Sequence, residues 1–186
     1  MPASTASGHL AKLVDAGLVA VERQGRHRYF RLADPAVARA LEALSVIAPD
    51  RPARSLREAK IGEALREART CYDHLAGRLG VALADSLVRD GVLEARDGDY
   101  LVRDRAPLDA IGIDVDQVAV SRRLLARACL DWSERRHHVA GALGAALASR
   151  LFELGWIERL PTSRAVRVTD SGRLELEAQL GVALCS

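Results

Sequence analysis

The sequence predicts a mainly α protein with small β-hairpins, a fold of the α+β class. Three observations indicate this class. Apolar residues recur at helical spacing in several long segments. Short runs of β-branched and aromatic residues flank glycine-containing turns, as strands of a hairpin do. An apolar helical segment that ends in glycine runs into such a hairpin at three places, near Gly17, Gly91 and Gly155.

Length and composition indicate a globular chain of one or two small domains. The sequence has 186 residues, of which 49% are hydrophobic and 28% are charged. This is enough for a sizeable hydrophobic core and a well-solvated surface. No apolar run is long enough to span a membrane, and the first residues lack the apolar segment of a secretion signal. We therefore expect a cytoplasmic protein without a membrane partner.

The first predicted element is a short amphipathic helix over residues 5–16, capped by Ser4 or Thr5 and ended by Gly17. A β-ribbon and a further helix that starts at Asp34-Pro35 follow it. The ribbon consists of strands 18–22 and 27–32 around a turn at 23–26. A helix followed by a β-ribbon is the second half of a winged helix, so residues 1–47 are expected to form a partial winged-helix domain.

Residues 48–55 contain two prolines among polar residues and are the expected linker. Residues 56–186 are expected to form a mostly helical domain with winged-helix-like pieces, serving as a sensor or dimerisation domain. Its expected elements are helices 56–90 (broken near Gly77 and Gly80), 118–128, 131–154 and 171–180, and hairpins 92–102 and 156–169. Asp131, with Glu134 three residues later, is expected to cap the third of these helices.

Positive charge is concentrated at the amino end. Residues 1–32 hold five Lys and Arg against two Asp and Glu, whereas the other 154 residues hold 22 against 23. A polyanion such as double-stranded DNA is expected to dock there, although an ordinary solvated surface remains the alternative. Small and polar residues on the exposed side of helix 5–16 let it enter a major groove, and cations of the wing 23–28 meet phosphates. The expected DNA-binding residues are Thr5, Ser7, Gly8, His9, Lys12, Arg23, Arg26, His27 and Arg28.

These residues carry a family resemblance. The stretch STASGHLAKLVDAGLV at residues 4–19, followed by GRHRYFRL at residues 25–32, resembles the ArsR/SmtB-type bacterial repressors. The resemblance implies a homodimeric winged helix-turn-helix that binds a palindromic operator and releases it when an inducer, often a toxic metal ion, binds. It also implies a longer member of the group, with residues 56–186 as a carboxy-terminal extension.

The sequence departs from the pattern of this family at its amino end. A domain of this family has further helices before the recognition helix, whereas this sequence offers only a few residues there. We expect either that the true reading frame begins upstream or that the domain is incomplete. The inner face of helix 5–16, with Leu10 and Leu13, is then expected to lack cover.

Cysteine and histidine residues of the second domain form a candidate metal site. Cys71 and His74 are three residues apart, which on a helix places a thiolate and an imidazole on one face. Cys129, Asp131 and either His137 or His138 are expected to complete the site, which would take zinc, cadmium or lead. The expected metal ligands are Cys71, His74, Cys129 and His138.

Other interpretations stay open at this point. Cys71 and Cys129 are also consistent with a redox-sensing thiol, or with small buried hydrophobes beside a structural His74 whose hydrogen bonds are satisfied. Val37, Leu41 and Leu44 are consistent with a dimerising interaction module. Four aromatic residues are consistent with a pocket for an organic inducer: Tyr72, Trp132, Phe152 and Trp156. The sequence has no phosphate-binding loop, zinc-protease pair or nucleophile elbow, so we do not expect an enzyme.

Overall fold

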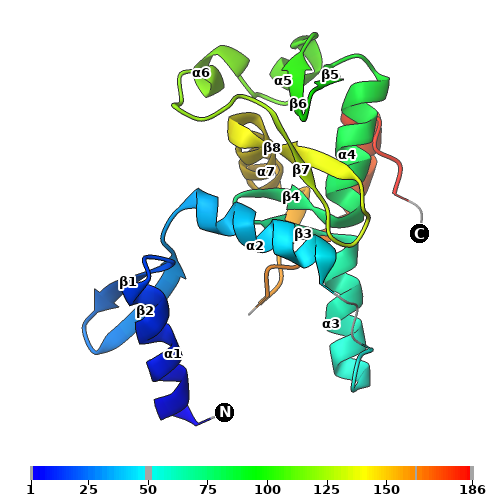
Figure 1. Cartoon of the computed structure of the whole chain (residues 1–186). Coiled ribbons are helices and arrows are strands. Elements are labelled where there is room, and N and C mark those ends of the chain that lie inside the picture. The colour runs from blue at the N-terminus through cyan, green and yellow to red at the C-terminus, as the bar shows by residue number, and fades with distance from the viewer. Residues whose placement is uncertain (1, 49–51, 162, 185–186) are drawn as a thin grey trace. The chain divides into compact units, whose positions relative to one another are not determined.

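The computed structural model describes residues 2–48, 52–161 and 163–184, and its fold is α+β, as the sequence predicts (Figure 1). The chain divides into two compact units, Met1–Ser45 and Val46–Ser186. Residues 49–51 of the expected linker lie outside the described residues. No helix among the described residues combines the length and the apolar character needed to cross a membrane.

The first unit runs helix, hairpin, helix: α1 (Ala3–Asp15), β1 (Val19–Gln24), β2 (His27–Leu32) and α2 (Pro35–Ile47), the last of which reaches the division between the units. Gly17 ends α1 as expected, with a left-handed φ of 70°. The Leu18 N–H donates to the Leu13 carbonyl at 3.0 Å, which completes a Schellman motif. The expected cap by Ser4 or Thr5 is wrong, because the helix already begins at Ala3 and no side chain caps it.

The second unit contains the same arrangement twice, a β-hairpin that leads through a helix into another hairpin. The first copy is β3 (Arg69–Cys71), β4 (His74–Ala76), α4 (Gly77–Arg89), β5 (Leu93–Arg96) and β6 (Asp99–Val102). The second is β7 (Arg127–Leu130), β8 (His137–Ala140), α7 (Gly141–Glu153), β9 (Ile157–Arg159) and β10 (Val166–Val168). Four more helices complete the unit: α3 (Leu56–Glu67), α5 (Ala106–Ala110), α6 (Val115–Ala119) and α8 (Asp170–Leu180).

The two copies are joined through one antiparallel sheet and through their helices. Strands β5, β6, β7 and β8 lie side by side in that order, whereas β3 pairs with β4 and β9 with β10 in separate ribbons. Helix α4 packs against β8 of the other copy, and α7 packs against β4. Both helices face the core with leucines at every fourth position, which is the expected spacing of a buried helical stripe. These are Leu79, Leu83 and Leu87 on α4 and Leu143, Leu147 and Leu151 on α7, all buried.

Three expected helices are wrong over part of their length, because strands form in 56–90, 118–128 and 131–154, and α6 already ends at Ala119. Residues 69–76, expected within a helix, form the β3–β4 hairpin, and the Thr70 N–H donates to the distant Arg164 carbonyl at 2.9 Å. The end of the expected helix 118–128 and the start of the expected helix 131–154 form the hairpin of β7 and β8. Because both hairpins are short and stabilised by contacts from far along the chain, local helical periodicity concealed them. The second unit is therefore richer in strands than the mostly helical domain we expected.

Candidate nucleic-acid interface and candidate metal site

The exposed side of α1 carries every residue that the sequence assigned to it for DNA binding. Ala6, Leu10 and Val14 are half-buried at helical spacing, and α1 packs on β1 within the first unit. The opposite side is small, polar or basic, as entry into a groove requires. Its exposed residues are Thr5, Ser7, Gly8, His9 and Lys12.

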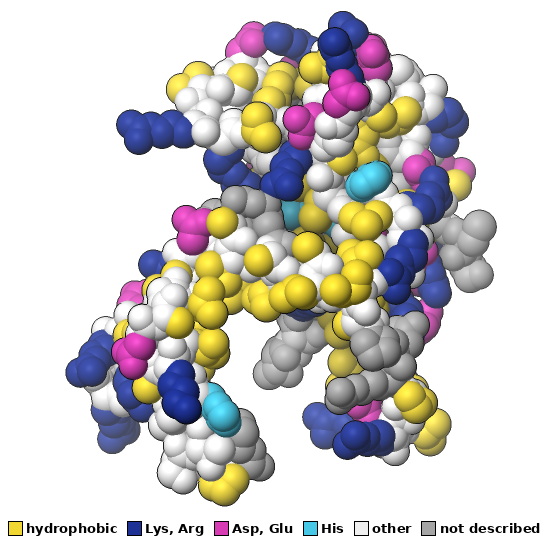
Figure 2. All heavy atoms as spheres, in the orientation of Figure 1, with side chains coloured by type: hydrophobic (Ala, Val, Ile, Leu, Met, Phe, Trp, Pro, Cys, Tyr) yellow, Lys and Arg dark blue, Asp and Glu magenta, His cyan; other side chains and the backbone are white. Residues whose placement is uncertain are grey.

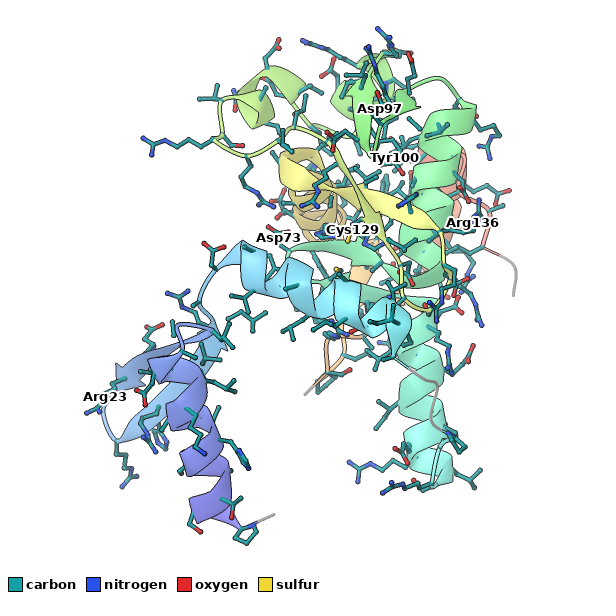
Figure 3. All side chains as sticks on the ribbon, in the orientation of Figure 1. Arg23, Asp73, Asp97, Tyr100, Cys129 and Arg136 are labelled. Atoms are coloured by element: carbon teal, nitrogen blue, oxygen red, sulfur yellow. The ribbon has the colours of Figure 1, made fainter. Side chains whose placement is uncertain are left out.

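The β1–β2 hairpin carries the expected wing cations, all of them exposed. Arg23 on β1 lies directly opposite Arg28 on β2, and a two-residue turn, in which Gly25 has a φ of 58°, places Arg26 and His27 at the tip. Figure 2 shows Lys and Arg side chains gathered over this part of the molecule, and Figure 3 labels Arg23. Like charges directly opposite each other destabilise a hairpin. Within the described parts of the chain, no acidic side chain pairs with Arg23, Arg26 or Arg28.

The apolar surface of the first unit is incompletely covered, as we expected for Leu13. That side chain is 39% exposed, and Tyr29 of β2 is 54% exposed. Among the first unit's described side chains only Ala38 is buried. Exposed apolar area of this kind is typical of surfaces that contact another polypeptide.

The four expected metal ligands come together in the second unit, but on strands rather than on a helix. Cys71 on β3 is the direct cross-strand partner of His74 on β4, and Cys129 on β7 is the direct partner of His138 on β8. Side chains opposite each other in an antiparallel pair point to the same face. Each hairpin therefore presents one sulfur and one imidazole together.

The donor atoms of these four side chains, two sulfurs and two ring nitrogens, all lie within 4.8 Å of one another. Cys71, His74 and His138 are buried, and Cys129 is half-buried. The two imidazole rings are 5.1 Å apart between centroids. Figure 3 labels Cys129 on β7 and Asp73 in the turn of the β3–β4 hairpin.

Hydrogen bonding leaves nitrogen atoms of both rings open toward the cluster. His74 Nδ1 lies 3.2 Å from the Asp73 carboxylate, whereas the buried His74 Nε2 has no hydrogen-bond partner. Neither ring nitrogen of His138 has one, although Nδ1 lies 3.5 Å from Asp131 Oδ2. Buried ring nitrogens are usually hydrogen-bonded, so these open nitrogens favour a ligand site over the alternative of a satisfied structural histidine.

The cluster favours ionised sulfur. The neighbouring Cys71 thiol lowers the pKa of the Cys129 thiol far below its ordinary value; burial raises it, and the nearby imidazoles of His138 and His74 lower it further. Burial lowers the pKa of His74, but the hydrogen bond to Asp73 and the nearby Cys129 sulfur outweigh that effect and leave the pKa raised. Thiolate is the form of cysteine that binds metals and reacts with oxidants.

Two arginine and aspartate pairs flank the cluster, and sequence reasoning missed both. The Asp131 carboxylate is fully buried and bonds Arg69 at 2.9 Å and the Gly77 N–H at 2.7 Å. Asp73 bonds Arg123 at 2.6 Å. The signal available in the sequence was the repeated pattern His-x-Ala-Gly-x-Leu-Gly at residues 74–80 and 138–144.

Other expected contributors do not join the cluster. Asp131 turns its oxygens to Arg69, Gly77, Ser133 and Glu134, which leaves it outside the donor set, and His137 is exposed. The expected capping by Asp131 occurs in a turn before β8 and not at a helix start. Of the four aromatic residues considered for an organic inducer, Trp156 lies in the core with Phe152 packed against that core, whereas Tyr72 is 47% exposed and Trp132 lies against Arg69.

Comparison with known proteins gives one informative match. The chain is 50% identical over 182 residues to a protein of Bacillus subtilis (strain 168) described as an uncharacterized HTH-type transcriptional regulator, YdfF. The match covers 97% of this chain and 80% of that protein. No family model matches the chain, and no solved structure matches it.

Proposed function

Because the chain belongs to the helix-turn-helix transcriptional regulators, we propose that it is a repressor that binds duplex DNA through α1 and the β1–β2 hairpin. The family consists of DNA-binding regulators and not of enzymes, which confirms the expectation that the chain is not an enzyme. The finer assignment, to the ArsR/SmtB type with a winged helix, belongs to the proposal and follows from the motifs of residues 4–32.

The observation that carries the proposal is the unpaired positive charge of the hairpin. Arg23 and Arg28 face each other across β1 and β2 without an acidic partner among the described residues. Such an arrangement costs free energy in the free protein, and a phosphate group placed against both guanidinium groups relieves it. Contacts of this kind position a protein on DNA, while α1 supplies the side chains for base edges.

We further propose that the repressor is a homodimer and that an effector bound in the second unit releases it from DNA. The exposed apolar residues Leu41, Leu44 and Ile47 of α2 supply the dimer contact. A symmetric dimer reads a palindromic site, which matches the type of operator that the family resemblance implies. The cluster of Cys71, His74, Cys129 and His138 is the proposed effector site, with a metal ion as inducer.

The proposed DNA binding is tested with duplexes that the protein selects from a random-sequence library. In anisotropy titrations at several salt concentrations, Arg23→Gln and Arg28→Gln should each weaken binding and reduce the slope of log affinity against log salt by about one. Arg96→Gln, an exposed arginine of the β5–β6 hairpin, is the matched control and should change neither quantity. Wild-type slopes in both wing variants would contradict the proposed interface.

Repression, and its release by a metal ion, are tested separately from DNA binding. A reporter promoter that carries the selected duplex should be transcribed less when the protein is present. Zinc added to the purified protein should weaken duplex binding by about tenfold or more, a coupling typical of allosteric proteins. Duplex affinity that does not respond to zinc loading would contradict release by metal and leave the DNA-binding assignment intact.

A further inference from the structure

We propose that Cys71, His74, Cys129 and His138 bind one divalent ion of the zinc class, and that this ion joins two copies of a single structural motif. The effector role of this ion rests on the proposed function, whereas the binding site itself does not. The ligands themselves all lie in the second unit, so the site does not depend on DNA binding.

The two copies donate equivalent ligands. Each cysteine lies at or next to the end of the first strand of its hairpin, and a histidine pairs with it on the second strand. In both copies this histidine is three residues before the glycine at which the helix begins. Both glycines, Gly77 and Gly141, have left-handed φ angles, of 77° and 82°. Six residues, 132–137, separate the aspartate from the histidine in the second copy, whereas Asp73 and His74 are adjacent in the first.

The copies meet at the two histidines. A Cβ added to Gly144 of α7 would lie 3.2 Å from the His74 Cβ, and one added to Gly80 of α4 would lie 3.5 Å from the His138 Cβ. Each histidine therefore sits over the glycine of the other copy's helix, where the missing side chain permits the approach. This reciprocal packing brings one cysteine and histidine pair from each copy into a single cluster.

The donor set fits a tetrahedral ion. Bonds of about 2.0–2.3 Å to zinc set the donor atoms roughly 3.3–3.8 Å apart, so the observed cluster has to contract by only about 1 Å. Two sulfurs with two imidazoles favour zinc and similar ions over magnesium or calcium, which prefer oxygen. The unpartnered nitrogen of His74, Nε2, is the one that a metal would take, because Nδ1 is held by Asp73.

Charge balance agrees with this assignment. A divalent ion with two thiolates and two neutral imidazoles has no net charge, which reduces the cost of burial. The nearby carboxylates are neutralised separately, Asp131 by Arg69 and Asp73 by Arg123. Any thiol proton still present when the ion binds passes to solvent. The flanking pairs therefore hold the ligands in place without adding charge to the site.

Metal titration of the full chain under anaerobic, reducing conditions tests the site. Zinc should bind with one ion per chain, and cobalt(II) should give the visible absorption of a tetrahedral complex together with a thiolate charge-transfer band. Cys71→Ser and Cys129→Ser should each reduce that band to about half. Each should also weaken zinc binding by about tenfold or more. Magnesium should compete with neither ion.

Matched controls and ligand exchanges keep the test decisive if a serine variant fails to fold. His137→Gln, next to His138 but exposed, should bind zinc as the wild type does, as should Cys185→Ser. His74→Cys and His138→Cys retain a metal donor at their positions. They should still bind one cobalt ion, and each should raise the charge-transfer band by about half.

Hydrogen exchange tests the joining of the two copies. Zinc should slow amide exchange in both hairpins, residues 69–76 and 127–140. At a zinc concentration that just saturates the wild type, Cys129→Ser should weaken the protection of both hairpins together. The proposal is overturned if folded protein binds no zinc at equimolar concentration, if binding survives the combined replacement of Cys71 and Cys129, or if zinc protects one hairpin alone. A Cys71 to Cys129 disulfide that persists in reducing buffer would overturn it as well.

Discussion

Arg69 and Asp131 form a fully buried ion pair, with Arg69 Nη2 2.9 Å from Asp131 Oδ2, between the two copies of the repeated motif. Asp131 also accepts a hydrogen bond from the Gly77 N–H at the start of α4. The guanidinium of Arg69 lies over the Trp132 ring, 4.5 Å from its centroid. A carboxylate from one copy thus holds a strand and a helix of the other, beside the proposed metal site.

Replacing Asp131 with asparagine should destabilise the protein by about 3–5 kcal/mol, because it leaves the buried Arg69 charge without its partner. Urea unfolding of the full chain measures the change. Asp116→Asn is the matched control, since Asp116 pairs with Arg105 on the surface and should lose less than about 1 kcal/mol. Equal losses in the two variants would show that burial of the Arg69 pair contributes nothing.

Low pH should remove the contribution that Asp131 makes to the free energy of unfolding. Burial raises its pKa, but hydrogen bonds from Gly77, Ser133 and Arg69 outweigh burial and leave the pKa far below its ordinary value. A carboxyl whose pKa is lowered by folding stabilises the fold above its unfolded pKa and loses that effect as the pH falls. The difference in unfolding free energy between wild type and Asp131→Asn should be constant above about pH 5 and shrink below about pH 4. A difference that grows toward acid would contradict this interpretation.

Close packing of α7 on β8 should make Gly144 intolerant of any side chain. An added Cβ would lie 2.4 Å from the Val139 carbonyl oxygen, so Gly144→Ala should destabilise by about 1–3 kcal/mol. Gly62 of α3 has open space around it and is the control. Gly62→Ala should stabilise by about 0.5–1 kcal/mol through better helix propensity. Chemical denaturation of both variants checks the opposite signs, and a neutral Gly144→Ala would contradict the packing.

Charge placed on α2 should separate the proposed dimer. Leu44 is 59% exposed, and Leu44→Glu should leave a particle of one chain mass where wild type has two, because a buried unpaired carboxylate is costly. Light scattering after gel filtration measures the mass. Leu174→Glu on α8, at a site that is 70% exposed, should not change it. A wild-type mass for Leu44→Glu would show that α2 is not the contact.

The sequence predicts an element correctly where residues close together in the chain are enough to form it. Gly17 and Gly155 end their helices with left-handed φ angles, and the predicted hairpin 92–102 forms as β5 and β6, with its turn at Asp97 and Gly98. Thr169, whose hydroxyl accepts from the Gly172 N–H, starts α8 within a residue of its expected position. Turns, caps and helix ends depend on residues close in sequence, so short patterns identify them.

The cluster shows where such patterns fail. The four residues expected as metal ligands lie together in one cluster, yet Cys71 and His74 meet across an antiparallel ribbon and not along a helix. The Asp73 and Asp131 pairs that flank them were not anticipated, because their arginine partners Arg123 and Arg69 lie far away in the chain. Side-chain periodicity carries no information on such distant partners.

The amino-acid sequence by itself determined the helix ends, three of the hairpins, the concentration of positive charge in residues 1–32 and the residue types of the donor set. Only the tertiary structure decided that residues 69–76 and 127–140 are strands and that their cysteines and histidines share one buried site. The physical reason is that strand pairing and burial depend on contacts between distant segments, such as the Thr70 N–H to the Arg164 carbonyl, whereas turns and caps form from neighbouring residues.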